Sequence, residues 1–184
     1  MCLVYADRYI LSSEWKRNFL PLRCRKDFLS LTSKALCRKK EYNIKDEPFV
    51  VTNTIPVQAF CQLRTAVHFQ LLTEPQAKQV LAHTTAVIAI RHGDRYVGIT
   101  RILFDYGTDA YLTDVIVHPD YQGQGIGGLL VKNALAYLQT HVQPGVRIAC
   151  SLYANPGKEP FYAAYGFQSL PNAQYGHGML LELS

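Results

Sequence analysis

The sequence has no hydrophobic run long enough to cross a membrane. Its longest clean apolar stretch, residues 86–90, falls far short of the roughly 20 residues that a membrane helix needs. The first residues also lack the basic stretch and apolar core of a secretory signal peptide, so secretion by that route is not expected. With 184 residues of ordinary globular composition, the chain has room for one domain of usual size and not for two.

Cysteine is sparse and histidine is scattered. The five cysteines are odd in number and widely spaced, without the CxxC pairs of a zinc site or the density of a disulfide scaffold. No two of the six histidines share a helix face at the spacing of metal ligands. The sequence therefore predicts free thiols, no metal, no membrane partner and a reducing compartment, which we take to be the cytoplasm.

Positive charge is concentrated in the N-terminal quarter. Residues 1–46 carry a net charge of +6 and the rest of the chain carries −1, for a total of +5. Because the first 45 residues show no helical or alternating period, we interpret residues 1–45 as a basic, at most partly ordered extension and residues 46–184 as the main domain. A nucleic-acid partner would need a coherent basic face, which is not visible. A transit peptide is disfavoured by the acidic residues in the same stretch.

From residue 48 onward the sequence alternates between strand and helix patterns. Stretches rich in β-branched residues and bounded by turn residues predict strands, and apolar residues at helical spacing predict helices. The predicted strands span residues 49–54, 86–90, 96–104, 110–117, 146–153, 167–170 and 179–183. The predicted helices run from about Pro56 to Leu71, from the residue after Thr73 onward, across residues 129–138 and across residues 159–165. The order β-α-α-β-β-β-α-β-α-β-β is an α+β arrangement in which a helix crosses over after the fourth strand.

A glycine-rich segment, residues 122–128, lies between the strand at 110–117 and the helix that follows. Glycines at such a junction let the backbone approach an anion and aim N–H groups at it, or they only permit a tight turn. A dinucleotide-binding loop would need an acidic residue about 20 positions further on, and residues 147–150 offer none. A Walker loop would need Lys-Ser or Lys-Thr after the glycines, which is also absent. Neither of these two nucleotide loops is expected.

The segment instead fits a third phosphate-binding pattern, Gln/Arg-x-x-Gly-x-Gly/Ala, and here the chain resembles the GCN5-related N-acetyltransferase (GNAT) superfamily. Residues 112–119 resemble that family's fourth strand, and residues 161–167, which read FYAAYGF, match its FYxxxGF element. Asn155 lies seven residues before Tyr162, where many members carry an asparagine. The resemblance covers about residues 48–184 and implies a GNAT-like fold with a central mixed, mostly antiparallel sheet.

The resemblance also implies an acetyl-CoA-dependent N-acetyltransferase that passes the acetyl group directly to a primary amine in a ternary complex. Acetyl-CoA would be a co-substrate, with its pyrophosphate on the N–H groups of the glycine-rich segment and its pantetheine arm along the fourth strand. The residues implied in binding it are Val115, Val117, Gln122, Gly123, Gln124, Gly125, Ile126, Gly127, Gly128, Asn155 and Tyr162.

Two residues are implied in catalysis. Tyr162 matches the family tyrosine that protonates the departing thiolate, since a phenol with a reference pKa of about 10 is protonated at neutral pH; the alternative is a core aromatic. Asp114 is acidic within an otherwise apolar strand, where it would be the general base or a structural carboxylate held by hydrogen bonds. Several relatives carry a carboxylate on the fifth strand, but that position is Cys150 here. A bound water chain is therefore a further alternative for the base.

The acceptor is expected to be a primary amine of a small molecule, with a protein N-terminus or lysine as the alternative. Arg64, Arg101 and residues 171–179 are candidates for the acceptor pocket, or else surface arginines and a plain loop. A non-catalytic acyl-CoA-binding regulatory module is the rival from another functional class. The oligomeric state is open and a homodimer is compatible with the sequence.

Overall fold

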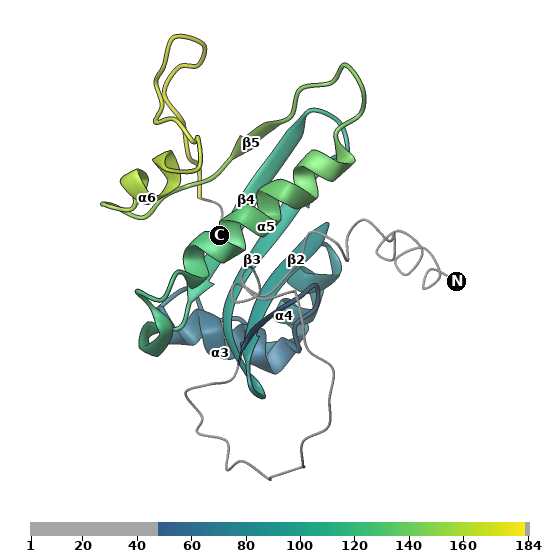
Figure 1. Cartoon of the computed structure of the whole chain (residues 1–184), viewed down its shortest axis with the longest axis vertical. Coiled ribbons are helices and arrows are strands. Elements are labelled where there is room, and N and C mark those ends of the chain that lie inside the picture. The colour runs from purple at the N-terminus through teal and green to yellow at the C-terminus, as the bar shows by residue number, and fades with distance from the viewer. Residues whose placement is uncertain (1–47, 183–184) are drawn as a thin grey trace, which may run out of the picture.

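The computed structural model describes residues 48–182 (Figure 1), and the basic extension predicted at residues 1–45 lies outside them. Five strands form one sheet in the order β1-β2-β3-β4-β5. They are β1 (Phe49–Thr52), β2 (Ala86–His92), β3 (Arg95–Phe104), β4 (Asp109–Val117) and β5 (Ala149–Ser151). Neighbouring strands are antiparallel except for the parallel pair of β4 and β5. The predicted mixed, mostly antiparallel sheet is therefore confirmed.

Helices cover both faces of this sheet. They are α3 (Val57–Ala66), α4 (Glu74–Ala82), α5 (Ile126–His141) and α6 (Glu159–Ala163), and a short 3-10 turn, η2, spans Pro119–Tyr121. The long helix α5 crosses one face, whereas α3 and α4 lie against the other (Figure 1). α5 also lies in the crossover connection that the parallel β4–β5 pair requires. None of the described helices is long and apolar enough to span a membrane.

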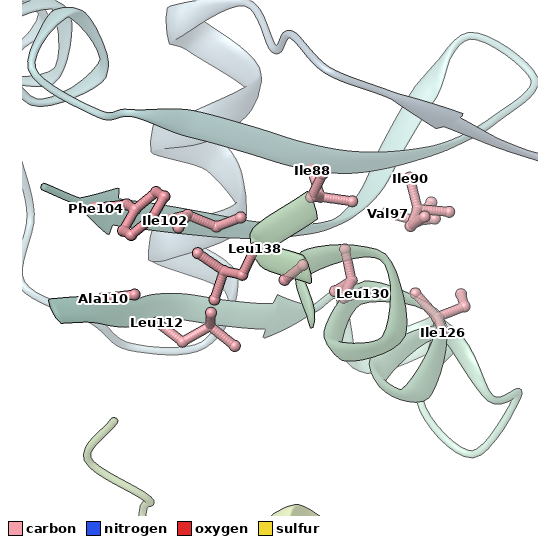
Figure 2. Close-up of a cluster of buried hydrophobic side chains, with 11 residues drawn as sticks. Ile88, Ile90, Val97, Ile102, Phe104, Ala110, Leu112, Ile126, Leu130 and Leu138 are labelled. Carbon is pink, nitrogen blue, oxygen red and sulfur yellow. The ribbon is translucent and has the colours of Figure 1, made fainter. Parts of the chain in front are cut away.

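The core consists of two apolar clusters, one on each face of the sheet. On the α5 face, Ile88, Ile102 and Leu112 of the sheet pack with Leu130 and Leu138 of the helix (Figure 2). The buried residues on the other face are Phe60, Leu63, Ala77, Ala89, Ile99 and Ile116. Burial of each large side chain stabilises the fold by about 2 kcal/mol. The two clusters therefore hold α3 and α5 in place against β4.

β4 contains a bulge near its C-terminal end. Between the cross-strand pairs Ile99–Ile116 and Arg101–Thr113, two residues of β4 oppose a single residue of β3. One of these two, Asp114, has a φ of +49°, which is uncommon for a residue with a side chain. Because of the extra residue, the side chains of β4 beyond the bulge exchange faces, and Ile116 joins the cluster beneath α3.

Several predicted elements are present with different ends. The helix predicted to reach Leu71 ends at Ala66, because the chain turns at His68, whose φ is +59°. The strand predicted at residues 146–153 is reduced to Ala149–Ser151, because the chain leaves β4 after that point. Local sequence patterns do not mark either end, since both depend on where the neighbouring element lies.

The last two predicted strands, at residues 167–170 and 179–183, are wrong for the described residues, because 167–170 and 179–182 form no strand. A strand is stable only when its main-chain groups pair with a neighbour and its side chains are packed. The side chains of Met179, Leu180 and Leu181 are exposed, so little apolar burial holds this segment against β5. Over the described residues the order is β-α-α-β-β-β-α-β-α, apart from the short turn η2.

Candidate active site

β4 and β5 separate immediately after the residues that pair. Their parallel ladder has three residue pairs and ends at Tyr111 and Ser151. Beyond this point lies a cavity of about 530 Å³, lined by β4 from Tyr111 to Val117 and by Leu152 and Tyr153, which follow β5. The start of α5, part of α6 and the segment between α3 and α4 also contribute to its lining. An extended ligand can therefore pair with the β4 edge that β5 has left.

The beginning of α5 presents main-chain N–H groups to this cavity. Gly125 is the N-cap residue, and both Gly123 (φ +76°) and Gly125 (φ +82°) adopt left-handed conformations. The Leu129 N–H donates to the Gly125 carbonyl (3.1 Å), so the N–H groups of the preceding turn have no partner within the helix. No acidic residue occupies that first turn, and the helix dipole adds positive potential. The arrangement suits a phosphate group.

The glycines of the segment serve two different purposes. A Cβ atom placed on Gly123 or Gly125 would meet nothing within 4 Å, so these two leave room for a ligand. A Cβ on Gly127 would lie 3.3 Å from Cζ of Phe161, and one on Gly128 would overlap the Tyr165 hydroxyl. Gly127 and Gly128 line the cavity, but they also let the aromatic residues of α6 and its C-terminal end approach α5.

The remaining residues predicted to bind acetyl-CoA divide into those that line the cavity and one that does not. Val115 and Val117 line it from β4, and Gln122 lines it while its side-chain amide donates to the Val117 carbonyl (3.1 Å). Gln124 is not part of the lining, and its amide reaches the Asp120 carbonyl (3.4 Å) instead. Asn155 and Ile126 are also lining residues.

Tyr162 lines the cavity from α6. Its ring is half-buried and packs against Phe161 and Phe167, with centroids 4.9 and 6.0 Å away. Burial raises the pKa of Tyr162 above its ordinary value, so the hydroxyl carries its proton at neutral pH. The side chain can therefore donate to a negative charge that develops in the cavity.

Asp114 lies at the bulge with both carboxylate oxygens engaged. One oxygen accepts from Nη1 of Arg64 and the other from Nε of Arg101 (2.6 Å). Asp114 is only 6% exposed. Each oxygen keeps a second lone pair, and Asp114 lines the cavity. Both readings of Asp114, as general base and as structural carboxylate, therefore stay predictions. Arg64 and Arg101, like residues 171–179, do not themselves line the cavity.

Cys150 does not line the cavity either. It lies on β5 against the α5-face cluster, and burial raises the pKa of its thiol to about 11. The thiol is therefore neutral at physiological pH and a poor nucleophile. Within residues 48–182, no group of three or more His, Cys, Asp or Glu side chains is arranged to hold a metal ion.

Sequence reasoning assigned no site role to eleven of the lining residues, of which five illustrate the reason. Val67 and Phe69 come from the segment between α3 and α4, and Tyr111, Tyr153 and Lys158 come from β4, the chain after β5 and the start of α6. The rings of Tyr111 and Tyr153 lie 5.7 Å apart in an edge-to-face arrangement. No motif marks these positions, because they meet only when α3 packs on the sheet and β5 diverges from β4.

Comparison with known sequences points to acetyltransferases. The family model described as "Acetyltransferase (GNAT) domain" matches residues 53–181. An uncharacterized N-acetyltransferase of Porphyra purpurea is 29% identical over 138 residues, which cover 72% of this chain and 76% of the relative. The chloroplastic GCN5-related N-acetyltransferase 2 of Arabidopsis thaliana is 34% identical over 83 residues, 45% of this chain and 30% of the relative.

Solved structures agree with the sequence matches. A Staphylococcus aureus protein of unknown function superposes with a TM-score of 0.65 at 26% identity, covering 73% of this chain and 99% of that protein. A GNAT-family acetyltransferase from Streptococcus pneumoniae gives a TM-score of 0.58 at 25% identity, covering 74% and 96%. Together with the divergence of β4 and β5 and the glycine-rich start of α5, these matches show that the chain belongs to the GNAT family of N-acetyltransferases.

Proposed function

We propose that the cavity between β4 and β5 binds acetyl-CoA and an amine together, and that the acetyl group passes directly from one to the other. The observation that carries this proposal is the convergence of three features on one cavity. They are the open edge of β4, the N–H groups at the start of α5, and the protonated hydroxyl of Tyr162. Such an arrangement suits an acyl donor whose diphosphate lies at the start of α5, whose extended arm lies along β4 and whose thioester lies near Tyr162.

In this proposal the donor is held by main-chain groups. The N–H groups of residues 123–128 bind the pyrophosphate. The main-chain groups of Val115 and Val117, at the free edge of β4, pair with the pantetheine arm. Lys158 supplies a positive charge at the start of α6, and is the only basic side chain among the described residues that line the cavity. The thioester then lies between the bulge of β4 and Tyr162.

The chemical step needs an acid for the leaving group and a route for one proton. The amine lone pair attacks the thioester carbonyl carbon, a C–N bond forms, and the C–S bond breaks. Tyr162 donates its proton to the departing thiolate. The neutral amine nitrogen becomes positively charged on attack and loses one proton through water to solvent, the route we propose because both oxygens of Asp114 already accept hydrogen bonds from arginines. Tyr162 is then reprotonated from solvent.

The acceptor we propose is a primary amine on a small molecule, because it has to share a cavity of about 530 Å³ with the thioester end of acetyl-CoA. A protein amine is the second candidate. It is supported by a Glycine max relative named histone acetyltransferase, which is 30% identical over 82 residues, 45% of this chain and 34% of that protein. We keep the cytoplasm as the proposed compartment, with the chloroplast as the alternative, since the Arabidopsis relative is named chloroplastic.

Thiol release tests the function directly. The full chain is incubated with acetyl-CoA and a panel of diamines, amino sugars, amino acids and a lysine-containing peptide, and free CoA is followed with a thiol reagent. We expect release that depends on one class of amine. Binding of CoA by calorimetry without release on any amine would instead support the acyl-CoA-binding module. No binding of CoA would contradict both.

A further inference from the structure

Arg64 makes contacts in three directions from the end of α3. Its Nη1 donates to the Asp114 carboxylate, and its Nε and Nη2 both donate to the Gln70 carbonyl (3.3 and 3.1 Å). The guanidinium carbon also lies 5.6 Å from the ring centroids of both Phe60 and Phe69. The planar guanidinium is suited to such multiple contacts, whereas an ammonium group is not.

These contacts join two parts of the cavity lining. The segment at residues 67–72 supplies Val67 and Phe69 to the cavity, and the bulge of β4 supplies Asp114 and Val115. Val67, Phe69 and Leu72 pack against the apolar cluster beneath α3, whereas Gln70 and Leu71 between them are exposed. The Arg64 guanidinium is therefore a direct polar connection between this segment and β4.

Arg101 offers a natural comparison. Its Nε donates to the other Asp114 oxygen (2.6 Å) and its Nη1 donates to the Thr84 hydroxyl (2.8 Å). Both arginine side chains are mostly buried, with 13% exposure for Arg64 and 11% for Arg101. Each balances the charge of Asp114, but only Arg64 bonds to the segment at residues 67–72. A difference between variants at the two positions therefore reports on that segment.

We propose that Arg64 is a positioning residue that fixes the acceptor side of the cavity by holding residues 67–72 against the bulge of β4. The segment follows α3, on the sheet face opposite α5, and the donor pyrophosphate would lie at the start of α5. Val67 and Phe69 are thus placed to direct the amine and not the donor. The inference rests on the proposed function, and it deepens it by naming what determines acceptor fit.

Hydrogen exchange tests the structural half of this proposal on the full chain. In R64M, the amides of residues 67–69, which donate to the Arg64 and Thr65 carbonyls, are expected to exchange at least about tenfold faster than in the wild type, because the local opening free energy falls. In R101M, which keeps both Gln70 bonds, the same amides are expected to keep their protection. Unchanged exchange in R64M, or equal acceleration in both variants, would overturn the proposal.

Kinetics test the functional half with the panel amine that the wild type acetylates fastest. R64M is expected to raise the KM for that amine about tenfold. The hydrogen bonds from Arg64 to Gln70 and Asp114 are lost, and the amine must then supply the free energy that holds Val67 and Phe69 in place. In R64M, the kcat and the Kd for CoA should change much less than the amine KM. In R101M, the amine KM should also change much less than it does in R64M. A merely structural role would instead lower kcat and CoA binding together with amine binding, which would contradict the assignment.

R64K separates charge from geometry and guards against poor folding of R64M. It keeps the positive charge beside Asp114, but one ammonium group cannot reproduce the fork of contacts to Asp114 and Gln70. We expect a raised amine KM and fast exchange in R64K as well. Restoration of both to wild-type values would mean that charge alone suffices and would overturn the proposal. A wild type that acetylates no amine defeats the proposed function, while the exchange experiment still decides whether Arg64 holds the segment.

Discussion

At the scale of single residues, the glycine-rich segment shows why residue type and residue role must be distinguished. Gly123 and Gly125 have positive φ and open space where a side chain would be, whereas Gly127 and Gly128 face aromatic residues at α6. The pattern of glycines by itself is compatible with an anion-binding turn and with a merely tight turn. Which glycines leave space for a ligand and which contact aromatic residues depends on where α6 packs, and no local pattern indicates that position.

Gly125→Val is expected to weaken acetyl-CoA binding about tenfold or more, because the side chain blocks charge-assisted hydrogen bonds to the pyrophosphate. It should also cost about 1–2 kcal/mol of stability through backbone strain. Gly145→Val is the matched control, since Gly145 has a φ of +80°, open space around it and no place in the cavity. Calorimetry and thermal unfolding measure the two effects. Equal binding losses in both variants would show that strain, and not obstruction, is responsible.

Tyr162→Phe is expected to lower kcat about a hundredfold, the usual size of a lost general acid, with little change in the Kd for CoA. The hydroxyl acts on the departing thiolate and contributes little to ground-state binding. Tyr175→Phe removes the same group from a residue outside the cavity lining and should leave turnover unchanged. Wild-type turnover in Tyr162→Phe, measured by thiol release, would mean that the tyrosine is only a core aromatic.

At the scale of elements, the sequence predicted helix beginnings better than helix and strand ends. α4 begins directly after Thr73, as predicted, and the side chains of Thr73 and Gln76 form a reciprocal capping box. Such signals involve residues three apart and are visible in any local window. The end of α3 and the short length of β5 are set by contacts with distant segments, so local periodicity extended both too far.

Thr73→Ala is expected to destabilise the fold by about 1 kcal/mol, because it leaves main-chain donors at the start of α4 without a partner. CoA binding should not change, since α4 does not line the cavity. Thr65→Ala is the control, because the Thr65 hydroxyl bonds back to the Cys61 carbonyl within α3 (3.0 Å) and caps nothing. Chemical denaturation compares them, and an equal loss in both would contradict the capping argument.

At the scale of the whole molecule, the cavity exists because the two sheet faces are covered differently. α5 fixes one face of β4 and α3 fixes the other, while β5 pairs with β4 over only three residue pairs. The divergence leaves space that no side chain of the described core fills. The family match over residues 53–181 lies within this unit.

A chain shortened to residues 46–184 is expected to unfold cooperatively and to bind CoA as the full chain does, because the cavity and both apolar clusters lie within residues 48–182. Circular dichroism melting and calorimetry measure these properties on both chains. Aggregation or loss of CoA binding in the shortened chain would show that the boundary at residue 45 is wrong and that the basic extension supports the fold.

The sequence by itself predicted the order of strands and helices up to residue 165, because periodicity and turn residues act over a few neighbouring positions. Its motifs, through their resemblance to a known family, also predicted the family and the mixed sheet. Only the tertiary structure decided that Arg64, fifty residues from Asp114 along the chain, occupies one of its carboxylate oxygens. It also decided that residues 167–170 form no strand and that Phe69 faces the cavity. These outcomes depend on how α3 packs across the sheet and where β5 leaves β4, and such long-range contacts have no signature in the local sequence.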